Sequence, residues 1–255
     1  LQEGSIVDVE SLLSPNSYNL EYKIHFLSSF SKYDDQEFIE FISEILMNIF
    51  KLSQLGIRPT VRLSCLSFLK DALCINNSLV ELIAYHKFFS IPFQSPPKNR
   101  EERILELNLL SIVSGLTRDA TKVIIDNNLL PFVLCSLRMP LKQIDSDIEE
   151  ESDNFEGQIE VNSDEENSYL DVACAALDVL REIAFCGAEA TEILYEYKVV
   201  GEIWQFLDDQ NQFNVIIAAL MALLEIIKYS PVEEQNWMAE NGLFEILGSF
   251  FESIP

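Results

Sequence analysis

Residues 213–251 decide the fold, and they read FNVIIAALMALLEIIKY (213–229), SP, VEEQNWMAE (232–240), NG and LFEILGSFF (243–251). Helical periodicity dominates these blocks, because apolar residues recur on one face at three- and four-residue spacing. They predict a long helix, a short helix and a third helix joined by short connections. The same order is expected at 169–185, 189–197 and 200–207, and again at 101–116 and 121–126 with a third helix from Leu130.

The spacing of the third helices reveals a repeat. Their starts are 41 residues apart from Phe89 to Leu130 and 43 residues apart from Val200 to Leu243. A period near 42 with two or three helices per unit is typical of armadillo and HEAT repeats. Such units stack into a superhelix with an extended concave surface. The sequence therefore predicts an all-α, right-handed superhelical solenoid of about six armadillo/HEAT-type repeats.

Helices are also expected towards the amino terminus. Tyr22, Phe26, Ser29, Phe30 and Tyr33 keep the spacing of one helix face. Further helices are predicted over 38–50, 62–73 and 80–88. Residues 1–255 are expected to form a single domain.

The distance from Leu130 to Val200 is 70 residues, which exceeds one period by about 28. An acidic insertion at about 141–168 accounts for the excess. It contains no Lys or Arg over residues 144–167, and its carboxylates are Asp145, Asp147, Glu149, Glu150, Glu151, Asp153, Glu156, Glu160, Asp164, Glu165 and Glu166. We expect it to be mobile and to pack little against the core.

The insertion has two interpretations. It is either a solubilising loop or a regulated segment, with Ser146 and Ser163 as candidate phosphorylation sites for an acid-directed kinase.

The net charge limits the partners. The chain carries 42 Asp and Glu against 17 Lys and Arg, a formal charge of −25. Such a field repels phosphate backbones and anionic lipid head groups, so binding to nucleic acid or to a membrane is not expected. The scarcity of glycine, at eight residues, favours helices over sheets. The five cysteines form no C-x-x-C pair and are interpreted as buried thiols of a reducing compartment.

No motif for catalysis or cofactor binding is present. The chain lacks P-loop, dinucleotide-binding, nucleophile-elbow and H-E-x-x-H motifs. The two histidines, His25 and His86, are interpreted as structural. We expect no catalytic residue, no cofactor and no metal site, and therefore no enzyme. Trp204 and Trp237 occupy positions that hold Leu or Ile in other units, which predicts packing, with an exposed anchor for a partner as the alternative.

In order and spacing, the helical blocks resemble the Rcd family ("required for cell differentiation"), the armadillo-type subunit of the CCR–NOT mRNA deadenylase complex. The stretches that carry the resemblance are Ser14-Pro15, VRLSCL (61–66), FSIPF (89–93), LELNLLSIVSGL (105–116), VII (123–125) and LLPF (129–132). They are packing positions, so they speak for the fold more than for an activity.

The resemblance also implies a groove, which is basic in that family. Arg62 matches one family arginine, but Glu106 stands where another is expected. Apolar residues occupy the basic positions of the penultimate long helix, at Ile216, Ala218, Ala219 and Met221. Nucleic-acid binding is therefore not carried over, whereas scaffold and peptide-groove roles are. The candidate groove or interface residues are Arg62, Glu106, Trp204 and Trp237.

The expected function is a non-catalytic adaptor of the CCR–NOT type. It would dock on a large scaffold subunit and bind short peptide motifs, in deadenylation, decay and translational repression of mRNA. The alternative is an assembly chaperone or regulatory solenoid of the proteasome or kinase type. A cytoplasmic location is expected, with the nucleus and a homodimer left open.

Overall fold

A computed structural model describes residues 13, 19–28, 45–46, 48–53, 59–75, 89–90, 93, 99–116, 118–138, 163–207 and 212–253. Within these ranges the chain is helical and contains no strand. The helices are α2 (Leu20–Ser28), α4 (Pro59–Ile75), α6 (Arg100–Leu116), α7 (Arg118–Asp126), α8 (Leu130–Arg138), α9 (Ser163–Phe185), α10 (Ala188–Glu196), α11 (Val199–Trp204), the 3-10 turn η4 (Gln205–Leu207), α12 (Phe213–Ile227), α13 (Val232–Glu240) and α14 (Leu243–Ser253).

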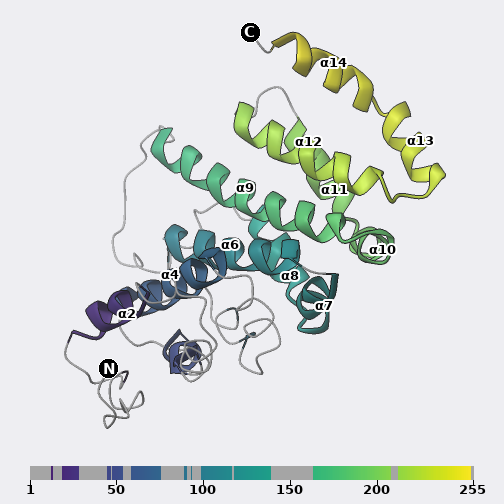
Figure 1. Ribbon diagram of the computed structural model, residues 1–255. Helices are drawn as coiled ribbons and strands as arrows, with labels where there is room; N and C mark the ends of the chain where they lie inside the picture. Colours follow the sequence, from purple (N-terminus) through teal and green to yellow (C-terminus); the bar gives the residue numbers. More distant parts are fainter. Residues whose placement is uncertain are drawn as a thin grey trace, which may run out of the picture.

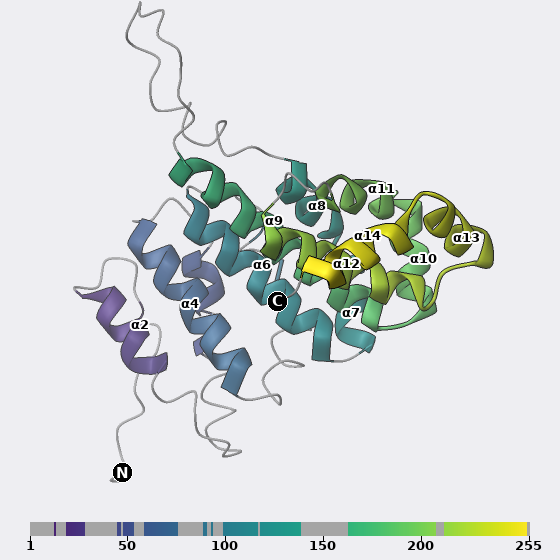
Figure 2. The ribbon, with the colours of Figure 1, turned by 90° about the horizontal axis from the view of Figure 1, so that it is seen from above.

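The long helices lie side by side and carry the core. Helix α4 packs between α2 and α6, and α9 packs between α6 and α12 (Figures 1 and 2). Leu107, Leu177 and Leu220 hold equivalent positions in α6, α9 and α12, and at most 3% of any of them is exposed. One continuous apolar core therefore runs through the units.

In space, each unit begins with the short helix, continues with the helix that the sequence analysis placed third, and ends with the long helix that follows it. The triplets are α7–α8–α9 and α10–α11–α12, and α13 and α14 repeat the first two positions. With the units divided in this way, residues 139–162 connect α8 to α9 within one unit. These residues lie outside the described ranges.

The turn between the short and third helices is the same in three units. Asn128, Lys198 and Gly242 have positive φ angles of 54°, 57° and 94°. Each donates its backbone N–H to the carbonyl three residues earlier, at Ile125, Tyr195 and Ala239. A left-handed residue after a helix satisfies free carbonyls and redirects the chain. The three units therefore share the backbone geometry of this turn as well as the sequence period.

The predicted helices agree well with the observed ones. The short helix at 232–240 has the predicted bounds, and α6, α7, α10, α11 and α14 differ from prediction by at most three residues at either end. Helix α9 begins at Ser163, six residues before the predicted start at Tyr169. Acidic residues are favoured in the first turn of a helix by the helix dipole, and the sequence at this point reads Asp164, Glu165 and Glu166. The last part of the predicted insertion is therefore helical.

The first predicted helix is present as α2, but the side that it buries is not the one that carries Tyr22 and Phe26. Tyr22 and Phe26 are 76% and 63% exposed, whereas Leu20, Ile24 and Leu27 are buried. Helix α2 carries two apolar stripes at helical spacing, and the aliphatic one packs against α4. Both stripes have helical spacing, but only one can pack against α4. The rings of Tyr22 and Phe26 lie on the other stripe and are therefore exposed.

Several predictions lie outside the described residues. These are the helix at 80–88 with His86, the stripe positions after residue 28, and most of the acidic insertion with Ser146. Among the residues that the structure does describe, no helix has the length and apolar character needed to cross a membrane.

The left-handed turn gives a stability prediction. We expect Gly242→Ala to destabilise the chain by about 1–2 kcal/mol, because a Cβ is strained at positive φ. Gly248 lies in α14, and a Cβ added there meets no atom within 4 Å. Gly248→Ala should therefore stabilise the same unit by about 0.5–1 kcal/mol. Chemical denaturation of both variants measures the difference, and equal effects would contradict the role of the turn.

Candidate functional site

A cluster of charged side chains is buried between α4 and α6. Arg62 is 4% exposed, and Glu102 and Glu106 are fully buried. The Arg62 guanidinium donates to Glu106 Oε1 at 2.6 Å and to the Ser53 carbonyl at 3.1 Å. Its Nε lies 3.3 Å from Glu102 Oε2. Burial of such charges requires pairing, and one arginine here serves two carboxylates.

A second arginine extends the cluster towards α8. Arg103 is 7% exposed, and it donates to the Ser136 hydroxyl at 3.1 Å. Its guanidinium carbon lies 4.1 Å from the centre of the Phe132 ring, a cation–π contact. Phe93 packs edge-on against the same ring, with centroids 5.7 Å apart. Two arginines and two glutamates thus join α4, α6 and α8.

Burial raises the pKa of Glu106 to about 7, although Arg62 and Arg103 lower it. The carboxylate of Glu102 adds to the rise. Burial also lowers the pKa of the Arg103 guanidinium. The charge of the Glu106 carboxyl therefore changes near neutral pH.

The cluster changes the interpretation of two candidate residues. Arg62 and Glu106 were expected in a groove, but the structure buries both and pairs them with each other. The Glu at position 106 is a partner for Arg62 rather than a surface charge. This pairing spans 44 residues of sequence, so helix periodicity could not reveal it.

The two tryptophans are brought together. Trp204 of α11 and Trp237 of α13 meet edge to face with ring centroids 5.4 Å apart. Trp204 packs against the core, whereas Trp237 is 42% exposed. Aromatic pairs of this geometry contribute about 0.5–1.5 kcal/mol beyond area burial. They join the last two units, and Trp237 remains partly exposed.

The outer side of the long helices forms an extended surface, which we call the long-helix face. Its residues are exposed or half-buried and hold equivalent positions in successive helices. They are Thr60, Leu63, Ser67, Lys70, Asp71 and Cys74 on α4; Glu101, Ile104, Asn108, Ser111, Ile112 and Gly115 on α6; Asp171, Cys174, Asp178, Arg181, Glu182 and Phe185 on α9; and Asn214, Ile217, Met221, Leu224, Glu225 and Lys228 on α12.

Charged groups on the long-helix face are mostly carboxylates, and its cations are largely paired. Arg181 lies 3.0 Å from Asp178 and 2.7 Å from Glu182. On the next long helix, α12, Glu225 pairs with Lys228 three residues later. Burial raises the pKa of Asp178, Arg181 lowers it, and Glu182 adds to the rise. Along α9 the face therefore has an acidic surplus, with Asp171, Asp178 and Glu182 against Arg181, whereas on α12 Glu225 and Lys228 balance.

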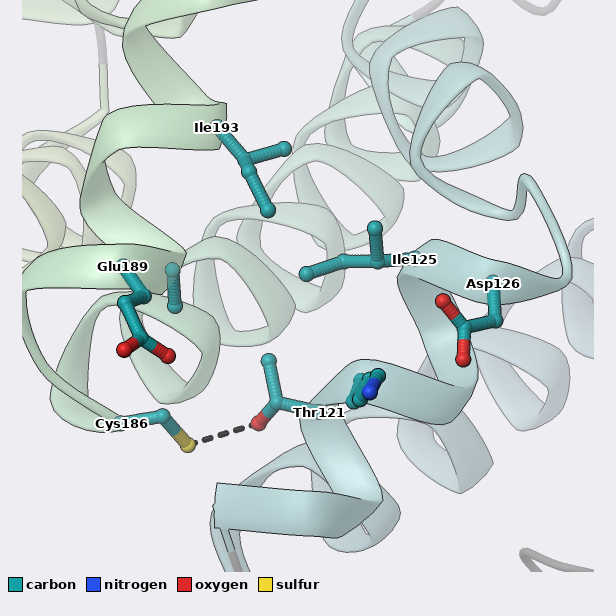
Figure 3. A pocket seen from close by; sticks show the side chains of 8 residues that line it. Thr121, Ile125, Asp126, Cys186, Glu189 and Ile193 are labelled. Atoms are coloured by element: carbon teal, nitrogen blue, oxygen red, sulfur yellow. Dashed lines mark hydrogen bonds between the residues drawn. The ribbon is translucent and has the colours of Figure 1, made fainter.

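A pocket of about 470 Å³ lies where α7 meets α10, beyond the carboxyl ends of α6 and α9 (Figure 3). Ile125 and Ile193 form opposite apolar walls, and Asp126 and Glu189 stand at its two sides. The Thr121 hydroxyl contacts the Cys186 thiol at one edge.

The next unit explains this pocket. The helices α7 and α10 are equivalent at a spacing of 70 residues, which places Tyr195 at the position of Ile125. The Tyr195 hydroxyl hydrogen-bonds Ser230, which precedes α13. Tyr195 thus contacts the segment that leads into α13, whereas the shorter Ile125 lines the pocket between α7 and α10.

No group of three or more His, Cys, Asp or Glu in the described residues could hold a metal ion. The cysteines are free, and they differ in exposure. Cys65 is buried, and burial raises the pKa of its thiol to about 12. Cys74 is exposed, which differs from the expectation of buried thiols. Ser163 is the first residue of α9.

Known structures share this architecture. The designed armadillo repeat protein YIII(Dq)4CqI is 17% identical, with a TM-score of 0.68 over 97% of this chain and 92% of its own. A computationally designed armadillo repeat protein for modular peptide recognition is 16% identical, with a TM-score of 0.69 over 97% and 92%. The chain has the armadillo-repeat fold. The predicted all-α armadillo-type solenoid is therefore confirmed.

A third similar structure is a designed armadillo repeat protein in complex with the peptide (KR)4. It is 16% identical, with a TM-score of 0.68 over 97% of this chain and 91% of its own. No protein-family model and no curated protein matches the sequence. Identities this low establish the fold and nothing finer.

The buried cluster predicts a pH dependence. A raised pKa means that the folded chain holds the Glu106 proton more tightly than the unfolded chain does. The free energy of unfolding should therefore fall as pH rises from about 4.5 to about 7, by on the order of 1.4 kcal/mol per pKa unit. Glu106→Gln should flatten this dependence, because it removes the titrating group.

The control for this prediction is Glu101→Gln, since Glu101 is exposed on the same helix. Denaturant melts of the three proteins between pH 5 and pH 8 measure the slopes. If the free energy of unfolding varied with pH equally in Glu106→Gln and Glu101→Gln, Glu106 would not be the titrating group.

Proposed function

We propose that this chain is a non-catalytic, protein-binding solenoid. Its long-helix face would hold an extended segment of a partner that carries Lys or Arg. The observation that carries the proposal is the alignment of four long helices, α4, α6, α9 and α12, with equivalent side chains exposed along one side. A row of equivalent positions suits a partner with a regular, extended backbone.

Charge supports the choice of a basic segment. Asp178, Glu182 and Glu225 lie on adjacent long helices, and the whole chain carries −25. Cations of a partner would compete with Arg181 and Lys228 for these carboxylates. Complementary charge raises association rates and excludes acidic competitors. Binding of (KR)4 by a designed protein of the same fold makes that peptide a suitable first probe.

At finer detail, we propose that the chain is an adaptor of the CCR–NOT type in mRNA deadenylation, decay and translational repression. Support comes from the order and spacing of the blocks that resemble the Rcd family, in particular 105–116, 123–125 and 129–132. These blocks fall on α6, α7 and α8. Short peptide motifs and a large scaffold subunit would be its partners, in the cytoplasm or the nucleus.

The alternative is an assembly chaperone or regulatory solenoid of the proteasome or kinase type. The same surfaces would serve it, because an acidic armadillo-type scaffold is compatible with either role. Affinity purification of the tagged chain with quantitative mass spectrometry separates them. We expect deadenylase subunits to be enriched, whereas proteasomal ATPases or a kinase in their place would overturn the CCR–NOT assignment.

Binding to the long-helix face is tested with a fluorescent (Lys-Arg)4 peptide at physiological salt. We expect measurable anisotropy change with the native chain. The triple variant Asp178→Asn/Glu182→Gln/Glu225→Gln should bind at least about tenfold more weakly, since each lost charge pair contributes up to about 1 kcal/mol at an exposed site.

The matched control is Glu192→Gln/Glu196→Gln/Glu240→Gln, which changes net charge equally on exposed positions of α10 and α13. It should weaken binding much less than the triple variant on the long-helix face. Equal losses in the two variants would show that the peptide responds to overall charge and not to the proposed surface.

A further inference from the structure

One guanidinium on the long-helix face is held by carboxylates from two helices. One terminal nitrogen of Arg181 lies 3.0 Å from Asp178 Oδ1, and the other donates to Glu182 Oε1 at 2.7 Å. The hydrogen bond to Glu182 raises the pKa of Arg181, burial lowers it, and the negative charge of Glu225 on α12 adds to the rise. Three carboxylates therefore surround one cation. We call Asp178, Arg181, Glu182 and Glu225 the Arg181 site.

Gly115 of α6 makes room for this site. Glu182 Oε2 lies 2.7 Å from the point where a Cβ on Gly115 would stand, which is too close for a carbon and an oxygen to coexist. The equivalent positions of the other long helices carry side chains, at Cys74, Phe185 and Lys228. The bare backbone at Gly115 therefore lets the Glu182 carboxylate lie against α6.

The pairs that hold Arg181 are local and accessible to solvent. Asp178 lies three residues before it and Glu182 one residue after it, and 33% of the Arg181 side chain is exposed. Partly exposed ion pairs of this kind contribute little to stability, because water screens them and the side chains lose freedom. A cation from outside can therefore take the place of Arg181 at little cost to the fold.

The geometry of the Arg181 site distinguishes arginine from lysine. Two terminal nitrogens of one guanidinium reach two different carboxylates, which uses the fixed, planar fork of this group. A lysine ammonium is a single point of charge on a flexible stem, so it cannot reproduce both contacts in the same way. The carboxylates are therefore placed for a guanidinium.

We propose that the Arg181 site binds an arginine side chain of the partner, and that Arg181 is its intramolecular occupant in the free chain. This inference rests on the function proposed above, in which the long-helix face holds a basic segment. It adds that arginine is preferred to lysine at this place. It also adds a limit on affinity, because the partner's guanidinium must displace Arg181 into solvent.

The proposal is tested on the full chain by the anisotropy of fluorescent (Gly-Arg)4 and (Gly-Lys)4 at physiological salt. Arg181→Ala should bind (Gly-Arg)4 at least about threefold more tightly than the native chain, since a competing ion pair is lost, and (Gly-Lys)4 should gain less. Arg181→Lys keeps the net charge and should also bind (Gly-Arg)4 more tightly, because an ammonium is the weaker competitor. Lys122→Ala removes an exposed cation of α7 and should retain the native affinity.

A double variant links the gain in affinity to Glu182. In Gly115→Ala the new Cβ meets the end of the flexible Glu182 side chain, so the carboxylate moves and the helix is kept. Gly115→Ala/Arg181→Ala should therefore lose most of the gain that Arg181→Ala shows for (Gly-Arg)4. Circular dichroism checks that each variant is folded.

Methylguanidinium separates a failure of this inference from a failure of the proposed function. At equal low concentration, it should raise the melting temperature of Arg181→Ala above the value in methylammonium, and Lys122→Ala should show no such difference. If Arg181→Ala shows none either, the Arg181 site is overturned, whether or not a peptide binds. Where the peptides bind, the inference is also overturned if Arg181→Ala gains no affinity for (Gly-Arg)4, or if Lys122→Ala gains as much. Stabilisation by methylguanidinium without binding of any peptide would support the site and contradict the function proposed for the long-helix face.

Discussion

Every other feature of this chain depends on the apolar packing of one long helix against the next. A single unit of three helices cannot bury its own faces, so each long helix needs neighbours on two sides. Helix α9 has both, in α6 and α12, and its Leu177 and Leu180 are fully excluded from water. The surfaces available for partners are the sides of the long helices that this packing leaves uncovered.

The buried charges of α4 and α6 lie inside this apolar stack. Four ionic groups in such a place cost desolvation energy, which pairing offsets only when the geometry is good. The bond from Arg62 to Glu106 and the contact of Arg103 with Phe132 supply that geometry. They also require one register between α4, α6 and α8, because an apolar contact tolerates sliding and a hydrogen-bonded charge does not. The cluster therefore determines how the first units align.

Periodicity was sufficient to predict which segments are helical, because each helix is long enough to show its own stripe. It failed where two signals competed. Helix α2 has two stripes, and the carboxylates before Tyr169 indicated an insertion while also favouring a helix start. Periodicity along the sequence could not predict contacts between units, such as the pairing of Arg62 with Glu106 and of Trp204 with Trp237.

The connection between α8 and α9 has a topological consequence. Residues 139–162 join two helices that already pack against each other, and α9 also packs on α6. A protease cut anywhere in this connection would separate the chain into two polypeptides without removing a contact between those helices. The fragments would remain associated through the interface that the intact chain uses internally. The α6–α9 and α8–α9 interfaces thus hold the segments on either side of residues 139–162 together independently of the covalent connection between them.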